Sequence, residues 1–224
     1  MTRMTRMLIA VPVWLGLTGI AAAQTTAPQA PQSPSESRGY AEVVAQSAFG
    51  NVTTQSYGGE VGFTIARRWN IFFEGGQVRD TATSTLNASA QSIAGAMAST
   101  QGTATASAKQ PVTFGLAGLR YPVRTRGGKV EPYVLGGAGI AQVTRDVVFS
   151  VGGSDVTNNM AQYGVVLGSD LAGSEKAAML SMGGGVMWPV LRHVVLDFQY
   201  RYGHIFSSES INVNRAGIGI GVRF

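Results

Sequence analysis

Residues 214–224, NRAGIGIGVRF, decide the fold class of this chain. Apolar side chains stand at every second position from Ala216 to Phe224, and only glycine or arginine stands between them. Alternation with a period of two is typical of a β-strand with one apolar and one polar face. This segment therefore predicts a strand whose two faces meet different surroundings.

The segment before it, 194–206, repeats the pattern with charge. Apolar side chains such as Leu196 and Phe198 face one way, whereas Asp197 and Arg201 face the other. An isolated charge buried away from water is costly, so the charged face must be paired or wet. We expect the apolar face to meet hydrocarbon and the charged face to line an enclosed interior.

Runs of about ten residues with this alternation recur along the chain. Strands of ~9–11 residues, tilted at about 45°, cross a bilayer, and closure leaves no unpaired edge in the hydrocarbon. Strands of soluble β-sandwiches are shorter, about five or six residues. The pattern predicts an all-β, eight-stranded antiparallel up-and-down transmembrane β-barrel over 39–224; the alternative is a secreted soluble β-protein. The predicted strands are Tyr40–Phe49, Tyr57–Ala66, Ile71–Asp80, Val112–Tyr121, Val130–Phe149, Ala178–Trp188, His193–Phe206 and Arg215–Phe224.

The connections between these runs alternate in length. Those at 67–70, 122–129 and 189–192 are short, and those at 81–111 and 150–177 are long. Outer-membrane barrels have short periplasmic turns and longer extracellular loops, which orients the chain. Two outer connections, 50–56 and 207–214, are shorter than this rule suggests.

Aromatic residues test this orientation, because they gather as girdles at both membrane interfaces. Those expected at periplasmic strand ends are Tyr40, Trp69, Tyr121, Tyr133, Trp188 and Phe224, and those expected at outer ends are Phe49, Tyr57, Tyr202 and Phe206. The simpler interpretation is that aromatic residues favour strands of any kind.

The N-terminal segment carries export information. Arg3 and Arg6 precede an apolar run over 7–20, and three alanines follow at 21–23. This is the pattern of a cleavable secretory signal peptide, so we assign 1–23 to it. Residues 24–38 are rich in Pro, Gln and Ser and predict a periplasmic linker.

Composition excludes several classes of protein. The chain has no cysteine, which excludes disulfides, thiolate metal sites and an acylated N-terminal cysteine. The formal net charge of +5 falls by two to +3 without Arg3 and Arg6, so no nucleic-acid partner is indicated.

The signal peptide, the alternating strands and the ending NRAGIGIGVRF together resemble the small outer-membrane β-barrel superfamily of OmpA-, OmpX- and opacity-protein-like barrels. The resemblance covers 39–224. It implies Sec-type export, a place in the cell outer membrane among outer-membrane lipids, and assembly by the barrel assembly machinery. The positions that match the family's assembly signal are Ile218, Ile220, Val222 and Phe224.

The interior of the predicted barrel carries opposite charges. Eight strands leave a space just wide enough for side chains to fill, so an open pore is not expected. Inward glycines at 217, 219 and 221 leave room for water, and a narrow channel stays an alternative. The inward polar set, expected to pair structurally, is Glu60, Glu74, Arg120, Asp197, Arg201, Arg215 and Arg223.

No cofactor, metal or catalytic site is expected. The glycine clusters at 136–139 and 183–185 lack a P-loop lysine and read as strand glycines, and the chain has only two histidines. His204, with serines at 207–208 and Glu209, is loosely similar to the lipid A deacylase barrels. In an extended strand, however, Ser207 faces away and Ser208 lies ~13 Å from His204, so only a tight bend after Phe206 could join them.

Charge and loop composition give the remaining hypotheses. Inner turns hold basic residues that could meet anionic lipid head groups, or that are simply solvated; these are Arg67, Arg68, Arg124, Arg126, Lys129 and Arg192. Outer loops hold the acidic residues Asp155, Asp170, Glu175 and Glu209.

The long outer segment 81–108 consists mostly of Ala, Ser, Thr, Gln and Gly. It predicts a flexible or weakly helical loop, with Ile93 and Met97 over the barrel mouth. The function predicted from the whole sequence is a structural or surface-interaction role, with an extracellular ligand meeting the outer loops. The alternatives are a small channel and a lipid A-modifying enzyme.

Overall fold

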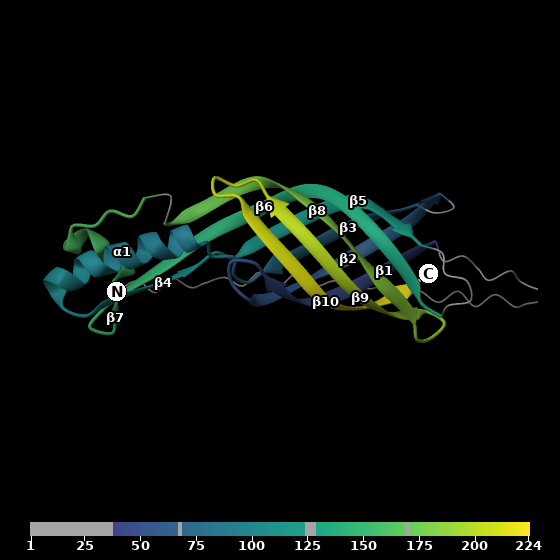
Figure 1. The fold of residues 1–224 in the computed structure, drawn as a ribbon, viewed down its shortest axis with the longest axis horizontal. Helices are drawn as coiled ribbons and strands as arrows, with labels where there is room; N and C mark the ends of the chain where they lie inside the picture. Colours follow the sequence, from purple (N-terminus) through teal and green to yellow (C-terminus); the bar gives the residue numbers. More distant parts are fainter. Residues whose placement is uncertain (1–37, 67–68, 124–128, 169–170) are drawn as a thin grey trace, which may run out of the picture. The chain divides into compact units, whose positions relative to one another are not determined.

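In a computed structural model, which describes residues 38–66, 69–123, 129–168 and 171–224, antiparallel strands close into a barrel (Figure 1). The predicted signal peptide and nearly all of the predicted linker lie outside the described residues. Every predicted run is a barrel strand, so the predicted fold class is confirmed. The strands are β1 (Gly39–Phe49), β2 (Thr54–Ala66), β3 (Trp69–Val78), β5 (Val112–Pro122), β6 (Glu131–Val151), β8 (Gly173–Pro189), β9 (Val194–Ile205) and β10 (Ile211–Arg223).

The last strand closes the barrel on the first. β10 pairs with β1 from Tyr40 opposite Arg223 to Phe49 opposite Asn214. The amide of Gly39 donates to the carbonyl of Phe224 at 3.0 Å, and the amide of Phe224 donates back at 3.0 Å. Closure gives the backbone N–H and C=O groups of the first and last strands hydrogen-bond partners, which hydrocarbon could not supply.

Glycines inside β6 and β8 allow close backbone approach, as the sequence predicted. A Cβ atom at Gly139 would collide with the backbone of Gly115 on β5, and one at Gly183 would collide with Tyr200 on β9. These positions therefore need glycine for the strands to pack and bend.

The outward face of the barrel is apolar. Val43 is 69 % exposed, Ile140 64 % and Phe198 50 %, whereas the alternate residue Asp197 is fully buried. Side chains of this size, exposed in quantity around a closed barrel, are unlike the surface of a soluble monomer.

The long outer connections are folded, to a greater extent than the flexible or weakly helical loop predicted for 81–108. They contain α1 (Ser84–Gln101), β4 (Ala104–Lys109), β7 (Ser154–Asp155) and the 3₁₀ helix η1 (Thr157–Tyr163). β4 and β7 pair with the end of β6 beyond the barrel. We call α1, β4, residues 146–151 of β6, β7 and η1 the outer module (Figure 1).

α1 forms because its ends are capped and one face is apolar. The Thr83 hydroxyl accepts a hydrogen bond from the Leu86 amide at 3.1 Å, and Gly102 ends the helix with φ +86°. Leu86 and Met97 are buried on one face, along with alanines at 90 and 94. Of the two predicted states of this segment, flexible or weakly helical, the structure shows the helical one over 84–101.

The outer module has its own apolar core. Met97 packs with Val147 and Phe149 of β6 and Met160 of η1, and Ile93 packs partly against them. The predicted position of Ile93 and Met97 over the barrel mouth is wrong, because β6 extends past the barrel and provides a separate surface. Within the described ranges, no helix combines the length and hydropathy needed to cross a membrane.

Candidate functional site

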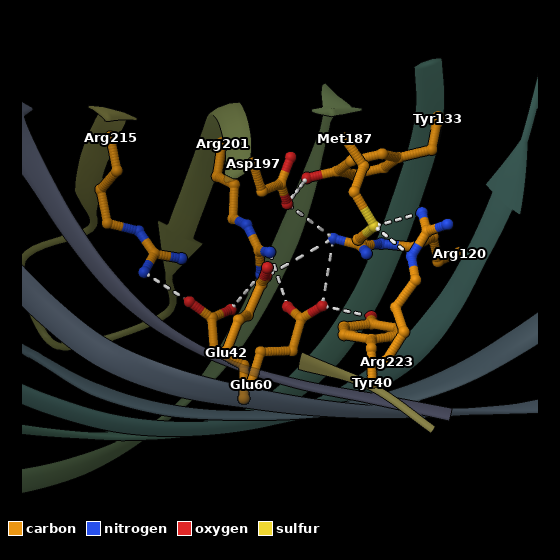
Figure 2. A network of polar contacts seen from close by, with 11 residues as sticks. Tyr40, Glu42, Glu60, Arg120, Tyr133, Met187, Asp197, Arg201, Arg215 and Arg223 are labelled. Carbon is orange, nitrogen blue, oxygen red and sulfur yellow. Dashed lines mark hydrogen bonds and ion pairs between the residues drawn. The ribbon is translucent and has the colours of Figure 1, made fainter. Parts of the chain in front are cut away.

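A network of ion pairs fills the middle of the barrel (Figure 2). Arg201 of β9 donates to Glu74 of β3 and to Glu60 of β2, each at 2.6 Å. Arg215 of β10 donates to the other oxygen of Glu74 at 2.8 Å. Glu74 therefore bridges two arginines, and Arg201 bridges two carboxylates.

Arg120 of β5 extends the network toward the end that carries the short turns. Its Nη2 lies 3.1 Å from Asp197 Oδ2 and 3.3 Å from Glu60 Oε1. Its guanidinium stacks between two phenol rings, 3.7 Å from the Tyr133 centroid and 4.5 Å from the Tyr40 centroid. Tyr133 donates to Asp197 at 2.6 Å, and Tyr40 donates to Glu60. Cation–π contact and charge-assisted hydrogen bonds thus hold Arg120 in place.

Glu42 of β1 is the least anchored member of this ion network. Its nearest cation is Arg120, at 3.6 Å, and no described group donates a hydrogen bond to either of its carboxylate oxygens. Four buried carboxylates, of Glu42, Glu60, Glu74 and Asp197, meet three buried guanidiniums. One negative charge is in excess when all seven groups are ionised.

The structure places the predicted interior set as follows. Six of its residues are at most 5 % exposed and belong to the network; they are Glu60, Glu74, Arg120, Asp197, Arg201 and Arg215. The seventh, Arg223, lies at the strand end, where Nη1 donates to Glu131 Oε1 at 2.8 Å and the carboxylate is half exposed. It forms this ion pair at the rim, and its Nη2 also lies 2.6 Å from the sulfur of Met187.

Sequence reasoning missed Glu42 and misplaced two tyrosines. Tyr40 and Tyr133 were predicted in the periplasmic girdle, but they are 5 % and 4 % exposed inside the barrel, so that prediction is wrong for them. The alternation of faces along each strand could have placed them correctly, because Tyr40 lies two residues before Glu42 and therefore faces the same side of β1. Trp69, Trp188 and Phe224 do lie exposed at the predicted end.

An apolar layer closes the interior on the outer side of the network. Val78 pairs with Val112, Val112 pairs with Val143, and Ile205 pairs with Ile211. All five are at most 1 % exposed and belong to one cluster. The sequence predicted a polar interior, but the side chains that point inward at the outer ends of the strands are apolar. The interior therefore contains the polar network, this apolar layer on its outer side, and a second buried apolar cluster, with Phe72 and Val195, toward the short turns.

The short outer connection after β9 is tied down from two sides. Glu175 Oε2 of β8 lies 2.8 Å from Arg145 Nη2 and accepts from the Ser208 hydroxyl at 2.8 Å. Thr83, the cap of α1, donates to Glu209 at 2.6 Å. The outer module is thus joined to the barrel through side chains as well as through β6.

Comparison with solved structures identifies the fold. No family model and no curated protein matches this chain. Neisserial surface protein A superposes with a TM-score of 0.52 and 16 % identity, over 83 % of this chain and 96 % of that one. A major outer membrane protein of Thermus thermophilus superposes with a TM-score of 0.52 and 10 % identity, over 83 % and 99 %. The fold is that of the small outer-membrane β-barrels.

In this barrel the residues expected to resemble a Ser/His/acid site do not come together. His204 Nδ1 lies 2.6 Å from Asn212 Oδ1, and the Ser207 hydroxyl donates to the carbonyl of Glu209. Ser208 is held by Glu175 instead. No described serine contacts His204, because the bend after Phe206 turns both serines toward these other partners.

The outer module contains a second local motif. Asp155 Oδ1 accepts hydrogen bonds from the Thr157 hydroxyl at 2.6 Å and the Thr157 amide at 2.9 Å. These bonds lower the pKa of the exposed Asp155 carboxyl and fix the turn from β7 into η1. In the described part of the chain no group of three His, Cys, Asp or Glu side chains is arranged to hold a metal ion.

Proposed function

We propose that this protein is an integral outer-membrane protein of the structural or surface-interaction class. Its barrel acts as a rigid anchor, and its outer module acts as the surface that meets partners. The observation that carries this proposal is the inversion of polarity in the barrel, with apolar side chains outside and ion pairs inside.

The outward face supports the bilayer location. Apolar side chains project from every barrel strand, among them Val61 on β2, Phe73 on β3 and Leu180 on β8, each 40–48 % exposed. Burying such surface in hydrocarbon is favourable by about 25 cal/mol per Å². Exposing the same apolar surface to water would be unfavourable.

The filled interior favours an anchor over a channel. The apolar layer around Val112 and Val143 lies between the outer end of the barrel and the buried arginines Arg201 and Arg215. An ion entering from outside would have to displace this layer to reach them. The channel alternative predicts stepwise conductance of the purified protein in a planar bilayer. The anchor predicts none.

The outer module supports the interaction role. Its apolar core fixes α1 and β4, while their other faces expose small polar side chains such as Thr105 and Ser107. One backbone edge of β4 has no paired strand among the described residues. A preformed surface lowers the entropy cost of binding an extracellular partner.

Cysteine labelling on intact cells tests the proposal, because the chain has no native cysteine. We expect Ser107→Cys to react with a membrane-impermeant maleimide and Lys129→Cys to react only after permeabilisation. The protein should fractionate with the outer membrane and migrate differently on gels with and without heating. Labelling of Lys129→Cys alone on intact cells would contradict the orientation, and fractionation as a soluble protein would contradict the location.

A further inference from the structure

A groove opens on the outward wall at the end of the barrel that carries the short turns. Its volume is ≈ 670 Å³, within the range of about 300–1,000 Å³ typical of ligand sites. It crosses β3, β5 and β6, and its lining residues are Trp69, Leu119, Tyr121, Val134, Leu135 and Gly136.

A missing side chain creates the groove. Gly136 pairs with Leu119 on one side and with Met182 on the other, and both neighbours project outward with 44 % and 60 % exposure. A Cβ atom at Gly136 would meet only the carbonyl of Ser181, at 3.9 Å. In contrast to Gly139, this glycine is not needed for backbone packing, so the fold does not explain it.

One row further into the wall, next to the residues that line the groove, the two central side chains are small. Ala117 pairs with Ala138 there, flanked by Phe73 on β3 and Leu180 on β8, each 48 % exposed. From Tyr121 to Ala117 the strand advances four residues, ~13 Å at about 3.3 Å per residue. Half of a hydrocarbon core is about 15 Å thick, so the length suits a chain confined to one leaflet.

Aromatic rings line the groove, and an exposed cation lies in the connection between two of its strands, β5 and β6. The Trp69 and Tyr121 rings lie 5.1 Å apart, and such residues favour the level of lipid head groups. Lys129 is exposed in the connection between β5 and β6. A cation at this level attracts anionic head groups.

We propose that this groove binds one acyl chain of an anionic phospholipid from the periplasmic leaflet, with its head group at Lys129. The inference rests on the proposed function, because it requires the outward wall to lie in a bilayer. It assigns to Gly136 a role in lipid binding.

Tryptophan quenching by brominated lipids tests the inference directly. Replacing Trp14 and Trp188 with Phe leaves Trp69 as the single tryptophan of the full chain. The protein is inserted into phosphatidylcholine vesicles that contain increasing fractions of dibrominated phosphatidylglycerol or dibrominated phosphatidylcholine. We expect phosphatidylglycerol to reach half-quenching at about a five-fold lower mole fraction, the preference that one cation near the surface supplies.

Matched variants locate the site. Gly136→Leu fills the groove and should bring the two quenching curves together. Gly75→Leu is the control, because its Cβ atom also meets a single backbone oxygen at 3.9 Å but lies outside the groove. Lys129→Gln should lower the preference for phosphatidylglycerol and leave quenching by phosphatidylcholine unchanged.

The outcomes separate the inference from the proposed function. Equal quenching by both lipids in the parent protein would overturn the inference and leave the membrane location intact. A preference that survives Gly136→Leu, or that Gly75→Leu removes, would also overturn it. Absence of quenching by either lipid would contradict the membrane location itself.

Discussion

The barrel and the outer module arrange polarity in opposite ways, and β6 belongs to both. In the barrel part of β6, Val134 and Ile140 are exposed, while Tyr133 faces ion pairs inside. In the module part, Phe149 is fully buried and Asp146 is exposed. One continuous strand thus exposes apolar side chains in the barrel and a charged side chain in the module, which is the contrast expected if the proposed bilayer surrounds the barrel and water surrounds the module.

The largest expected effect comes from removing the central cation of the barrel. Arg201→Met leaves the Glu60 and Glu74 carboxylates buried with fewer partners, and breaking a buried pair costs about 3–5 kcal/mol. We expect the free energy of unfolding in urea, measured in vesicles, to fall by that amount. Arg223→Ala at the half-exposed rim is the control and should cost about 0–1 kcal/mol.

A second change sharpens this result. Adding Glu60→Gln to Arg201→Met should recover part of the lost stability, because it removes one of the poorly compensated charges. If Arg201→Met were as stable as the parent, water would have to enter the barrel interior freely. Charged groups in the barrel would then be solvated, as they are in the module.

The next effect separates the two cores. Phe149→Ala removes a fully buried ring from the module and should cost about 3–5 kcal/mol there. We expect rapid proteolysis within 81–111 on whole cells, with an unchanged heat-dependent gel shift of the barrel. Loss of the gel shift would show that barrel and module unfold as one unit.

The sequence was sufficient for the barrel because its signal has a period of two and persists over long strands. It was insufficient for the module, because Ala, Ser and Thr in 84–109 carry little periodic contrast, and the partner of α1 is the far end of β6. The network pairs, such as Arg201 with Glu74, join residues 127 positions apart. Alternation along each strand shows which side chains point into the barrel. Which of them form pairs depends on the register of all the strands between them.

A smaller effect concerns the link between the two regions. Thr83→Ala removes the cap of α1 and the hydrogen bond to Glu209, and loss of a cap costs about 1 kcal/mol. Hydrogen exchange of the first turn of α1 should accelerate about five-fold, with barrel amides unaffected. Glu209→Gln keeps the cap and should change the exchange rate less; an equal change would make the link, and not the cap, responsible.

The smallest effect is expected at Glu42. Because its carboxylate accepts no hydrogen bond from a described group and adds the excess negative charge, Glu42→Gln should leave the unfolding free energy within about 1 kcal/mol of the parent. Glu74→Gln, at a carboxylate with two arginine partners, is the matched comparison. A larger loss at Glu42 than at Glu74 would reverse the order of importance within the network.

Spin-label accessibility tests the central claim most directly. Single cysteines at Ile218, Ile220 and Ser107 carry a nitroxide in the vesicle-inserted protein, which has no other cysteine. The account predicts that labels at Ile218 and Ile220 collide with oxygen dissolved in the lipid, whereas the label at Ser107 collides with a water-soluble nickel complex. Labels at Ile218 and Ile220 that meet the nickel complex, or neither reagent, would contradict it.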